Sequence, residues 1–353
     1  MKTRKIGSLI VSDVCLGTMT YGNATLREDA FAQMDRALDA GIGFWDTAEM
    51  YPVNPATAET YGLSEIIIGE WFARSGRRAD VQIATKASGK GGSGRFSRGD
   101  AGFEPGNIEE AVDLSLKRLQ TDVIDLYQLH WPKRGTYAFR GNWTYDPGTS
   151  SKARVEDHMN GIAEAMGRIV AAGKVREFGL SNETAWGTMA WNAAAARTGG
   201  PRVVSIQNEY GPLHRLYDTD MAEVGQKEDV TLLAYSPLAA GLATGKYSGG
   251  ATPPGSRAAV DVAHGGPGNL GGRRTDRGVE AADAWVALAR DLGHDPVHLA
   301  IAFVRARPFP AIPIIGATDA GQLDHLLAGL DVTIDADAAS RIDAFHRAHP
   351  LPF

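Results

Sequence analysis

The sequence of 353 residues predicts an α/β fold in which eight parallel strands close into a (β/α)8 TIM barrel. Segments with the apolar patterns of strands and of helices alternate almost from end to end, and the count of core strands is eight. Several strands end on a polar or titratable residue, as strands of such barrels do at their carboxyl-terminal face. A doubly wound open sheet also alternates strands with helices and is the second possibility. Because barrels of this size commonly fold as one unit, we expect residues 1–353 to form a single domain.

The first half of the chain supplies a hairpin and four core strands. Residues 26–40 carry apolar side chains at helical spacing and are followed by Gly41, a residue type that accepts the left-handed conformation after a helix. The expected elements are a hairpin at Lys5–Val11, strands at Val14–Gly17, Phe44–Asp46, Val81–Thr85 and Ile124–His130, and helices at Leu26–Ala40, at Glu65–Ala73 with Ser64 as N-cap, and from about Asn107.

The second half repeats this alternation. A helix that stops at Gly173 leads into the fifth core strand, and three more core strands follow. The expected elements are helices at Glu156–Ala172, Ala185–Ala196, Gly278–Leu292 and Pro296–Arg305, and strands at Val175–Leu180, Val203–Gln207, Thr231–Ala234 and Ala311–Ile315.

Three long segments interrupt the alternation, namely Ser88–Gly106, Lys133–Ala153 and Ser248–Gly278. Each follows a strand, so each is expected to overhang the carboxyl-terminal face as a lid over cofactor and substrate. The first contains Gly89–Gly94, which matches the G-x-G-x-x-G fingerprint of dinucleotide-binding turns. That turn must open a helix, and no helical pattern begins here before Asn107, so we reject a Rossmann site.

Composition excludes several classes of protein. A formal net charge of -6 argues against a nucleic-acid groove, which needs a basic stripe. The single cysteine, Cys15, excludes a disulfide framework and fits a reducing compartment. The first residues lack the apolar core of a signal peptide, and no apolar run is long enough to span a membrane. We therefore expect a cytoplasmic protein without nucleic-acid or membrane partners; the sequence does not specify an oligomeric state.

Four titratable residues are expected to meet at the carboxyl-terminal face. Asp46, Lys86 and His130 end three successive strands, and Tyr51 follows Asp46 by five residues. A phenol ionises near pH 10 in water, a neighbouring ammonium favours the phenolate, and a carboxylate keeps that ammonium in place. Each residue alone has an ordinary structural explanation. Together they suit proton transfer to a carbonyl oxygen while a hydride reaches the carbon, so we predict an active site here.

These residues lie within motifs that resemble the signatures of the aldo-keto reductase family. The similarity extends from Arg4 to about Leu330. The motifs are Asp46–Tyr51, the strand-end Lys86, Leu126–Pro132, Gly179–Asn182, Gln207–Tyr210 and Ala234–Tyr247, and those most similar to a bacterial branch of the family are Ala48–Val53, Ser115–Asp122 and Ile315–Thr318.

The resemblance implies a barrel that reduces a small carbonyl compound, an aldehyde or ketone, with NADPH and without a Rossmann domain. It implies that Tyr51 is the general acid, assisted by Lys86 and Asp46, and that His130 orients the carbonyl. It also implies a set of cofactor-binding residues that runs from the nicotinamide through the pyrophosphate to the adenosine 2′-phosphate. These are Gly17, Thr18, Met19, Asp46, Ser181, Asn182, Gln207, Tyr235, Ser236, Pro237, Leu238, Gly241, Lys246, Arg257, Gly316, Thr318 and Gln322.

The substrate and cofactor ends are less defined. Tyr21 and Trp131, with Trp143 and Tyr145, are candidates for an aromatic substrate wall, although the last two can also pack within their own loop. At the adenosine end many relatives carry Lys or Arg where this chain has Thr318. The preference for NADPH over NADH is therefore expected to be smaller than in those relatives.

Two other functions compete with a reductase. Potassium-channel β-subunits share the implied fold and bind NADPH but serve mainly to dock a partner; this chain keeps His130, which favours an enzyme. A metal-dependent barrel hydrolase could use Asp46, Glu49 and His130 as ligands. The commonest hydrolases of that kind need a His-x-His pair on the first strand, where this chain has Thr18-Met19-Thr20, so we predict no metal.

Overall fold

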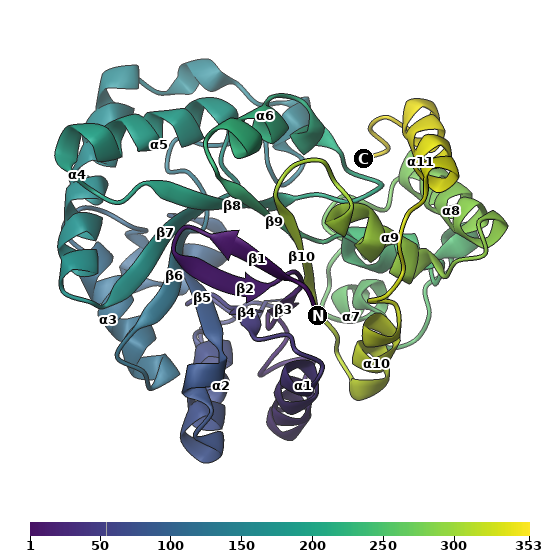
Figure 1. The fold of residues 1–353 in the computed structure, drawn as a ribbon, viewed down its shortest axis with the longest axis horizontal. Coiled ribbons are helices and arrows are strands. Elements are labelled where there is room, and N and C mark those ends of the chain that lie inside the picture. The colour runs from purple at the N-terminus through teal and green to yellow at the C-terminus, as the bar shows by residue number, and fades with distance from the viewer. Residues whose placement is uncertain (54) are drawn as a thin grey trace.

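A computed structural model describes residues 1–53 and 55–353. Eight strands form a closed parallel barrel in the order β10-β3-β4-β5-β6-β7-β8-β9, which confirms the predicted (β/α)8 fold and excludes the open sheet (Figure 1). The barrel strands are β3 (Cys15–Gly17), β4 (Phe44–Asp46), β5 (Gln82–Ala87), β6 (Ile124–Leu129), β7 (Val175–Ser181), β8 (Val203–Glu209), β9 (Thr231–Tyr235) and β10 (Ala311–Ile315).

The order of the strands brings the predicted site residues to one end of the barrel. β4 ends at Asp46, Lys86 is the penultimate residue of β5, and His130 follows β6 directly. Because neighbouring strands are parallel and in sequence order, their carboxyl ends share one rim. Every position of β6 is buried, as expected for a strand covered on both faces.

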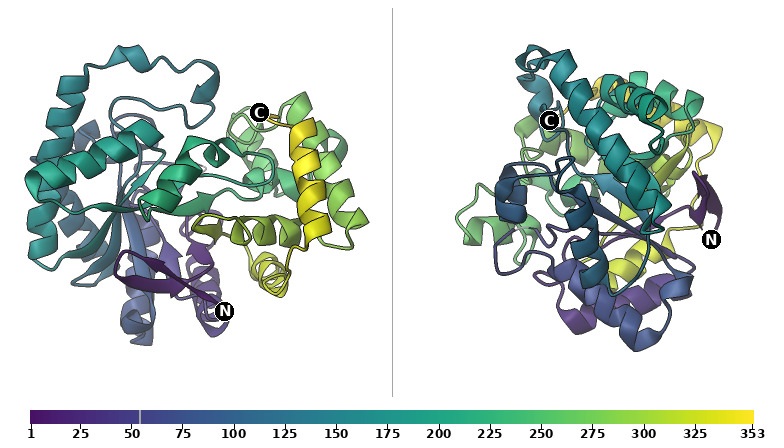
Figure 2. Two further views of the ribbon diagram at one scale, coloured as in Figure 1. Left: turned by 45° about the horizontal axis from the view of Figure 1, so that its top comes forward. Right: turned by 90° about the vertical axis from the view of Figure 1, so that its left-hand side faces the viewer.

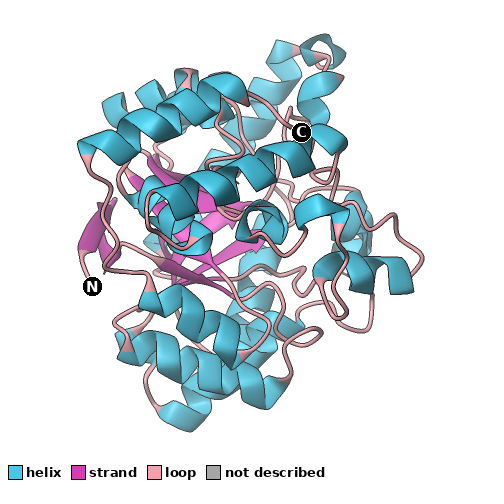
Figure 3. Cartoon of the chain, turned by 90° about the vertical axis from the view of Figure 1, so that its right-hand side faces the viewer, coloured by secondary structure: helices cyan, strands magenta, loops and turns pink. Residues whose placement is uncertain are grey.

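Helices surround the strands, as Figure 3 shows in cyan around magenta. Helix α3 illustrates why they form, because its buried residues Ile108, Ala111, Val112, Ser115 and Leu119 repeat at helical spacing and face the barrel. The helices are α1 (Arg27–Asp39), α2 (Leu63–Ser75), α3 (Ile108–Leu119), α4 (Lys152–Ala171), α5 (Ala185–Thr198), α6 (Asp220–Lys227), α7 (Arg257–Ala263), α8 (Asp276–Asp291), α9 (Pro296–Arg305), α10 (Ala320–Ala328) and α11 (Ala336–Ala348).

The amino-terminal hairpin closes the opposite end of the barrel. Strands β1 (Thr3–Ile6) and β2 (Leu9–Ser12) pair antiparallel, and both views of Figure 2 show them in dark purple at the edge of the barrel. Ile6, Leu9 and Val11 pack against residues of the barrel strands, including Phe44 of β4. The hairpin therefore covers this end of the barrel, and the large cavity lies at the carboxyl-terminal end.

Helices α6, α10 and α11 were not predicted, and three of the predicted features differ in detail from the structure. Ser64 is not an N-cap: α2 begins at Leu63 after Gly62, whose φ of 80° is left-handed, and the Ser64 hydroxyl instead donates to the Tyr21 carbonyl oxygen at 2.8 Å. Helix α4 begins at Lys152, four residues earlier than expected. Segment Ser248–Gly278, expected as a loop, contains α7, which Ser256 caps by accepting a bond from the Ala259 amide.

All three long segments contribute residues to the large cavity at the carboxyl-terminal end. The glycine-rich motif Gly89–Gly94 opens no α-helix: its last residues belong to a short 3₁₀ helix over Gly92–Phe96, in agreement with the rejected Rossmann site. Gly89 is required for packing, since a Cβ there would lie 2.1 Å from the indole nitrogen of Trp131. Within residues 1–53 and 55–353, no helix is both long and apolar enough to cross a membrane.

Candidate active site

A buried ion pair lies at the centre of the carboxyl-terminal rim. The Lys86 ammonium is 2.6 Å from Asp46 Oδ2 and donates a second bond, of 2.7 Å, to the Thr47 carbonyl oxygen. The side chain of Lys86 is fully buried and that of Asp46 is 3% exposed. Burial alone would lower the pKa of Lys86, but Asp46 and Tyr51 raise it above its ordinary value. The amine therefore stays charged.

Two side-chain amides also donate hydrogen bonds to Asp46. Gln207 Nε2 donates to Asp46 Oδ1 at 2.8 Å, and Gln128 Nε2 donates to the same oxygen at 3.2 Å. Both side chains are buried, so their bonds fix the carboxylate against rotation. Gln128 was not predicted as a site residue, because a glutamine within a strand carries no signal that distinguishes this position from others.

Tyr51 lies above the ion pair, with the Lys86 ammonium 4.8 Å from its ring centre. It packs with Ala48 and Met50 against Met19 and Trp131. Burial raises the pKa of Tyr51 above its ordinary value; the charge of Lys86 opposes that rise without overcoming it. The sequence suggested a phenol pushed towards the phenolate, whereas in the structure the phenol keeps its proton at neutral pH.

His130 is the second polar group beside Tyr51. The two rings meet edge to face, with centroids 5.7 Å apart and planes at 78°. Burial, followed by the nearby charge of Lys86, lowers the pKa of His130 well below its ordinary value, so the imidazole is neutral. Its Nδ1 is buried and has no hydrogen-bond partner among the described residues.

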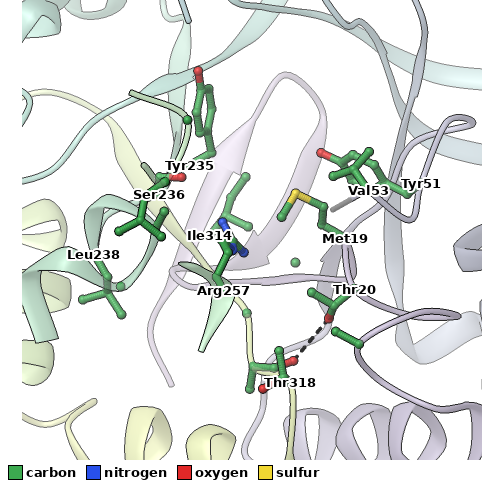
Figure 4. A pocket seen from close by; sticks show the side chains of 18 of the residues that line it. Met19, Thr20, Tyr51, Val53, Tyr235, Ser236, Leu238, Arg257, Ile314 and Thr318 are labelled. Atoms are coloured by element: carbon green, nitrogen blue, oxygen red, sulfur yellow. Dashed lines mark hydrogen bonds between the residues drawn. The ribbon is translucent and has the colours of Figure 1, made fainter. Parts of the chain in front are cut away.

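A cavity of about 1500 Å³ opens above these groups. Figure 4 shows Tyr51, Val53 and Met19 on one side of it and Tyr235, Ser236 and Leu238 on the other, with Arg257 between them. Every residue that the sequence assigned to the cofactor lines this cavity, namely Gly17, Thr18, Met19, Asp46, Ser181, Asn182, Gln207, Tyr235, Ser236, Pro237, Leu238, Gly241, Lys246, Arg257, Gly316, Thr318 and Gln322.

Hydrogen bonds connect the two walls of the cavity near His130. The Tyr235 hydroxyl donates to Asn182 Oδ1 at 2.8 Å, and Asn182 Nδ2 donates to the His130 carbonyl oxygen at 2.9 Å. Asn182 adopts a left-handed φ of 54°, a conformation that asparagine tolerates better than most residues. The network holds Tyr235 and His130 at fixed positions relative to each other.

The far end of the cavity carries Arg257 and several neutral donors. Arg257 begins α7, and no ion pair or hydrogen bond of its side chain occurs among the described residues. Burial and the neighbouring Arg273 charge lower its pKa. Gln322 Nε2 donates to Thr318 Oγ1 at 2.8 Å and to Asp319 Oδ2 at 2.6 Å. Asp319 also caps α10, so its carboxylate is engaged by its own helix.

The predicted aromatic wall is partly wrong. Tyr21 does not line the cavity: it is fully buried in the core, and its hydroxyl donates to Gln33 Oε1 at 3.3 Å. Trp143 is 57% exposed, and it and Tyr145 also lie outside the cavity lining. Trp131 does line it, together with Phe139, which sequence reasoning missed.

A second ion-pair group, also missed, joins two of the overhanging segments. Glu209, the last residue of β8, binds Arg273 through contacts of 2.8 and 2.9 Å and also pairs with Arg140. Arg140 lies in the segment after β6 and Arg273 in the segment after β9. The Arg140 guanidinium lies 5.0 Å from the ring centre of Phe353. Glu209 therefore ties the two segments together beside the cavity.

The carboxylates proposed for a metal hydrolase have other partners. Glu49 accepts a 2.6 Å bond from the Ser88 amide and pairs with Arg98, while Asp46 is held by Lys86. Glu49 thus fixes the start of the segment after β5.

Comparison with known proteins agrees with this geometry. A sequence model of the Aldo/keto reductase family matches residues 13–347. Protein tas of Escherichia coli (strain K12) is 42% identical over 347 residues, which cover 98% of this chain and 97% of that protein. The uncharacterized oxidoreductase YrpG of Bacillus subtilis is 32% identical over 93% of this chain and 90% of its own length. Aldo-keto reductase yakc of Schizosaccharomyces pombe, whose name specifies NADP(+), is 32% identical over 69% of this chain. The chain therefore belongs to the aldo/keto reductase family and is an NAD(P)H-dependent oxidoreductase.

Proposed function

We propose that this protein reduces aldehydes or ketones to alcohols with NADPH, using Tyr51 as the general acid. The observation that carries this proposal is the protonated phenol of Tyr51 placed over the buried Lys86–Asp46 pair and beside a neutral His130. All three lie where the large cavity reaches the barrel rim. We also propose that residues 1–353 act as a single domain and that the protein is cytoplasmic.

The residues of the cavity fit a nicotinamide dinucleotide phosphate. Amide and hydroxyl groups of Ser181, Asn182 and Gln207 line one end, next to the Tyr235 ring. Lys246 and Arg257, two cations without a carboxylate partner among the described residues, line the rest with Thr318 and Gln322. Such a cavity offers polar partners for a carboxamide, an aromatic face for its ring and cations for phosphates. The NADP(+) in the name of the fission yeast relative points to the same cofactor.

The proposed chemistry divides between the cofactor and the protein. When bound, the nicotinamide supplies the hydride that reduces the carbonyl carbon. Tyr51 donates its proton to the carbonyl oxygen as negative charge develops there. Lys86 then stabilises the resulting phenolate, and Asp46 keeps Lys86 charged and in place. Because Tyr51 and Lys86 are buried, water weakens these interactions little.

His130 is proposed to orient the carbonyl group. A neutral imidazole can hold the carbonyl oxygen by a hydrogen bond without protonating it, and the lowered pKa of His130 favours that form. The Asn182 bond to the His130 carbonyl oxygen fixes the backbone at this position. The apolar side chains Met19, Val53, Trp131 and Phe139 line the cavity here, which favours apolar or aromatic carbonyl compounds.

The direct test is a spectroscopic screen of NADPH oxidation across apolar, aromatic and charged aldehydes and ketones, with NADH in parallel. We expect turnover that is fastest for apolar or aromatic aldehydes and faster with NADPH than with NADH. Tight NADPH binding without turnover of any carbonyl would instead favour a cofactor-sensing protein that docks a partner.

A further inference from the structure

A group of two histidines and one aspartate lies on the wall of the cavity outside the reductase site. Asp295 is the N-cap of α9, His298 lies in the first turn of that helix, and His325 lies near the end of α10. One potential ligand atom from each side chain lies within 4.8 Å of the others. Within residues 1–53 and 55–353, this is the one group of three histidine, cysteine or acidic side chains whose potential ligand atoms lie so close together.

The spacing of these side chains suits a transition-metal ion. Zinc binds imidazole nitrogen and carboxylate oxygen at about 2.0–2.2 Å, so two ligands of a tetrahedral site lie roughly 3.3 Å apart. His325 Nε2 lies 3.2 Å from Asp295 Oδ1, a hydrogen bond whose length also matches that separation. The rings of His298 and His325 have centroids 4.7 Å apart, and one nitrogen of each ring and a carboxylate oxygen of Asp295 all lie within 4.8 Å of one another.

The hydrogen bonding of the His298 ring is that of a histidine that binds a metal ion. Its Nε2 lies 2.6 Å from the backbone oxygen of His325, and because that oxygen can only accept, Nε2 must carry the hydrogen. The lone pair is therefore on Nδ1. Histidines that bind metals usually donate their other ring N–H to a carbonyl or carboxylate in this way. Gly329 makes room for the ring, since a Cβ there would lie 2.3 Å from His298.

The helix cap accounts for Asp295, and hydrogen bonds to Asp295 and to the His325 carbonyl oxygen engage one nitrogen of each histidine, which leaves the other nitrogen of each ring for a metal. Capping α9 requires Asp295, whose Oδ1 accepts bonds from the Val297 and His298 amides at 2.8 and 3.3 Å. It requires neither histidine. Neutral imidazole and carboxylate together form a common ligand set for zinc, with one coordination position left for water.

We propose that Asp295, His298 and His325 form a binding site for one divalent transition-metal ion of the zinc class. His325 and Asp295 both line the cavity, and His325 lies one turn after Gln322 on α10. The ion would add positive charge to the end of the cavity where Thr318 stands. If NADPH binds as proposed above, the ion therefore strengthens its binding.

The site is tested first without cofactor. Tag-free protein treated with a chelator is titrated with Zn²⁺ by calorimetry. We expect one equivalent to bind to the wild type, and binding to weaken by more than about 100-fold in His298→Ala and His325→Ala. Asp295→Asn removes the charged ligand but keeps a good helix cap, so it should lose zinc without losing stability. His264→Ala, at another histidine of the cavity wall, is the control and should bind normally.

Absence of a stoichiometric zinc-binding event, or binding that survives the two histidine substitutions, would overturn the site. The coupling is then measured as the NADPH dissociation constant with and without Zn²⁺. We expect zinc to tighten NADPH binding by about fivefold or more in the wild type and to have no effect in His325→Ala. Zinc binding with an unchanged NADPH constant would overturn the coupling alone. Failure of NADPH to bind at all would count against the proposed function and leave the metal site standing.

Discussion

Lys86 Nζ and Asp46 Oδ2 lie 2.6 Å apart, and both side chains are buried. Such a pair contributes little net stability compared with apolar packing, but removing one partner is costly because the other charge stays buried. Its retention at the rim of the barrel is therefore best explained by chemistry. The pair supplies a fixed positive charge beneath the Tyr51 ring.

Replacement of Lys86 by methionine tests that interpretation. The free energy of unfolding of Lys86→Met should be about 3–5 kcal/mol lower than that of the wild type, since the Asp46 carboxylate loses its counter-charge. It should also lose carbonyl reduction, because the Tyr51 phenolate is no longer stabilised. Arg36→Met is the matched control: Arg36 pairs with Asp324 on the surface, where both side chains are nearly half exposed, and the expected cost is below about 1 kcal/mol. Urea unfolding measures the free energy of unfolding of both variants. Equal losses of that free energy in Lys86→Met and Arg36→Met would contradict this account.

Glu209 gives the protein a predictable response to acid. Burial would raise its pKa, but Arg273, His214 and Arg140 lower it from 4.5 to about 2. A carboxyl group whose pKa is lowered by folding stabilises the fold at any pH above its pKa in the unfolded chain. That stabilisation is lost as the pH falls through the pKa in the folded protein. The shift corresponds to about 3 kcal/mol at neutral pH, of which roughly 2 kcal/mol is gone by pH 3.

Urea unfolding between pH 6 and pH 3 measures this contribution. The wild type should lose roughly 2 kcal/mol more than Glu209→Gln over that range, because the glutamine does not titrate. Glu164→Gln, at an exposed position of α4, is the control and should follow the wild type. If the free energy of unfolding of the wild type and of Glu209→Gln fell equally with pH, the ionised Glu209 carboxylate would not stabilise the fold through its arginine partners.

Cofactor preference depends on the cations at the far end of the cavity. Arg257 lacks an ion-pair partner among the described residues, whereas Thr318 and Gln322 offer neutral hydrogen bonds. Charge-assisted bonds are roughly twice as strong as neutral ones. We therefore expect NADPH to bind more tightly than NADH, Thr318→Arg to widen the ratio and Arg257→Ala to narrow it. Fluorescence titration gives both constants, with the exposed Arg277→Ala as control. Equal or tighter NADH binding by the wild type would refute the NADPH assignment but leave a reductase.

The sequence predicted the barrel and the strand-end residues because both depend on local patterns. An apolar run followed by Asp46, Lys86 or His130 is visible in the sequence, and parallel strand order then places these residues on one rim. The motif-based cofactor residues also line one cavity. Their individual roles stay predictions until variants are measured.

Other features depend on contacts that no local pattern encodes. Glu209 and Arg273 are 64 positions apart, and Arg273 lies in a segment expected to be an irregular loop. Tyr21 seemed suited to a substrate wall, but its side chain turns into the core towards Gln33. Ser64 precedes a helical pattern like an N-cap, yet Gly62 takes that place because its left-handed φ ends the preceding turn. Each outcome was decided by packing between distant segments.

The central claim is that the Tyr51 hydroxyl supplies the proton. The most direct measurement compares Tyr51→Phe with the wild type in single-turnover reduction of a good aldehyde substrate, alongside the NADPH dissociation constant of each. Tyr145→Phe, outside the cavity lining, is the control. We predict that Tyr51→Phe lowers the reduction rate by about 10²–10⁴-fold while NADPH binding is unchanged. A Tyr51→Phe rate close to that of the wild type, with NADPH bound, would contradict the mechanism.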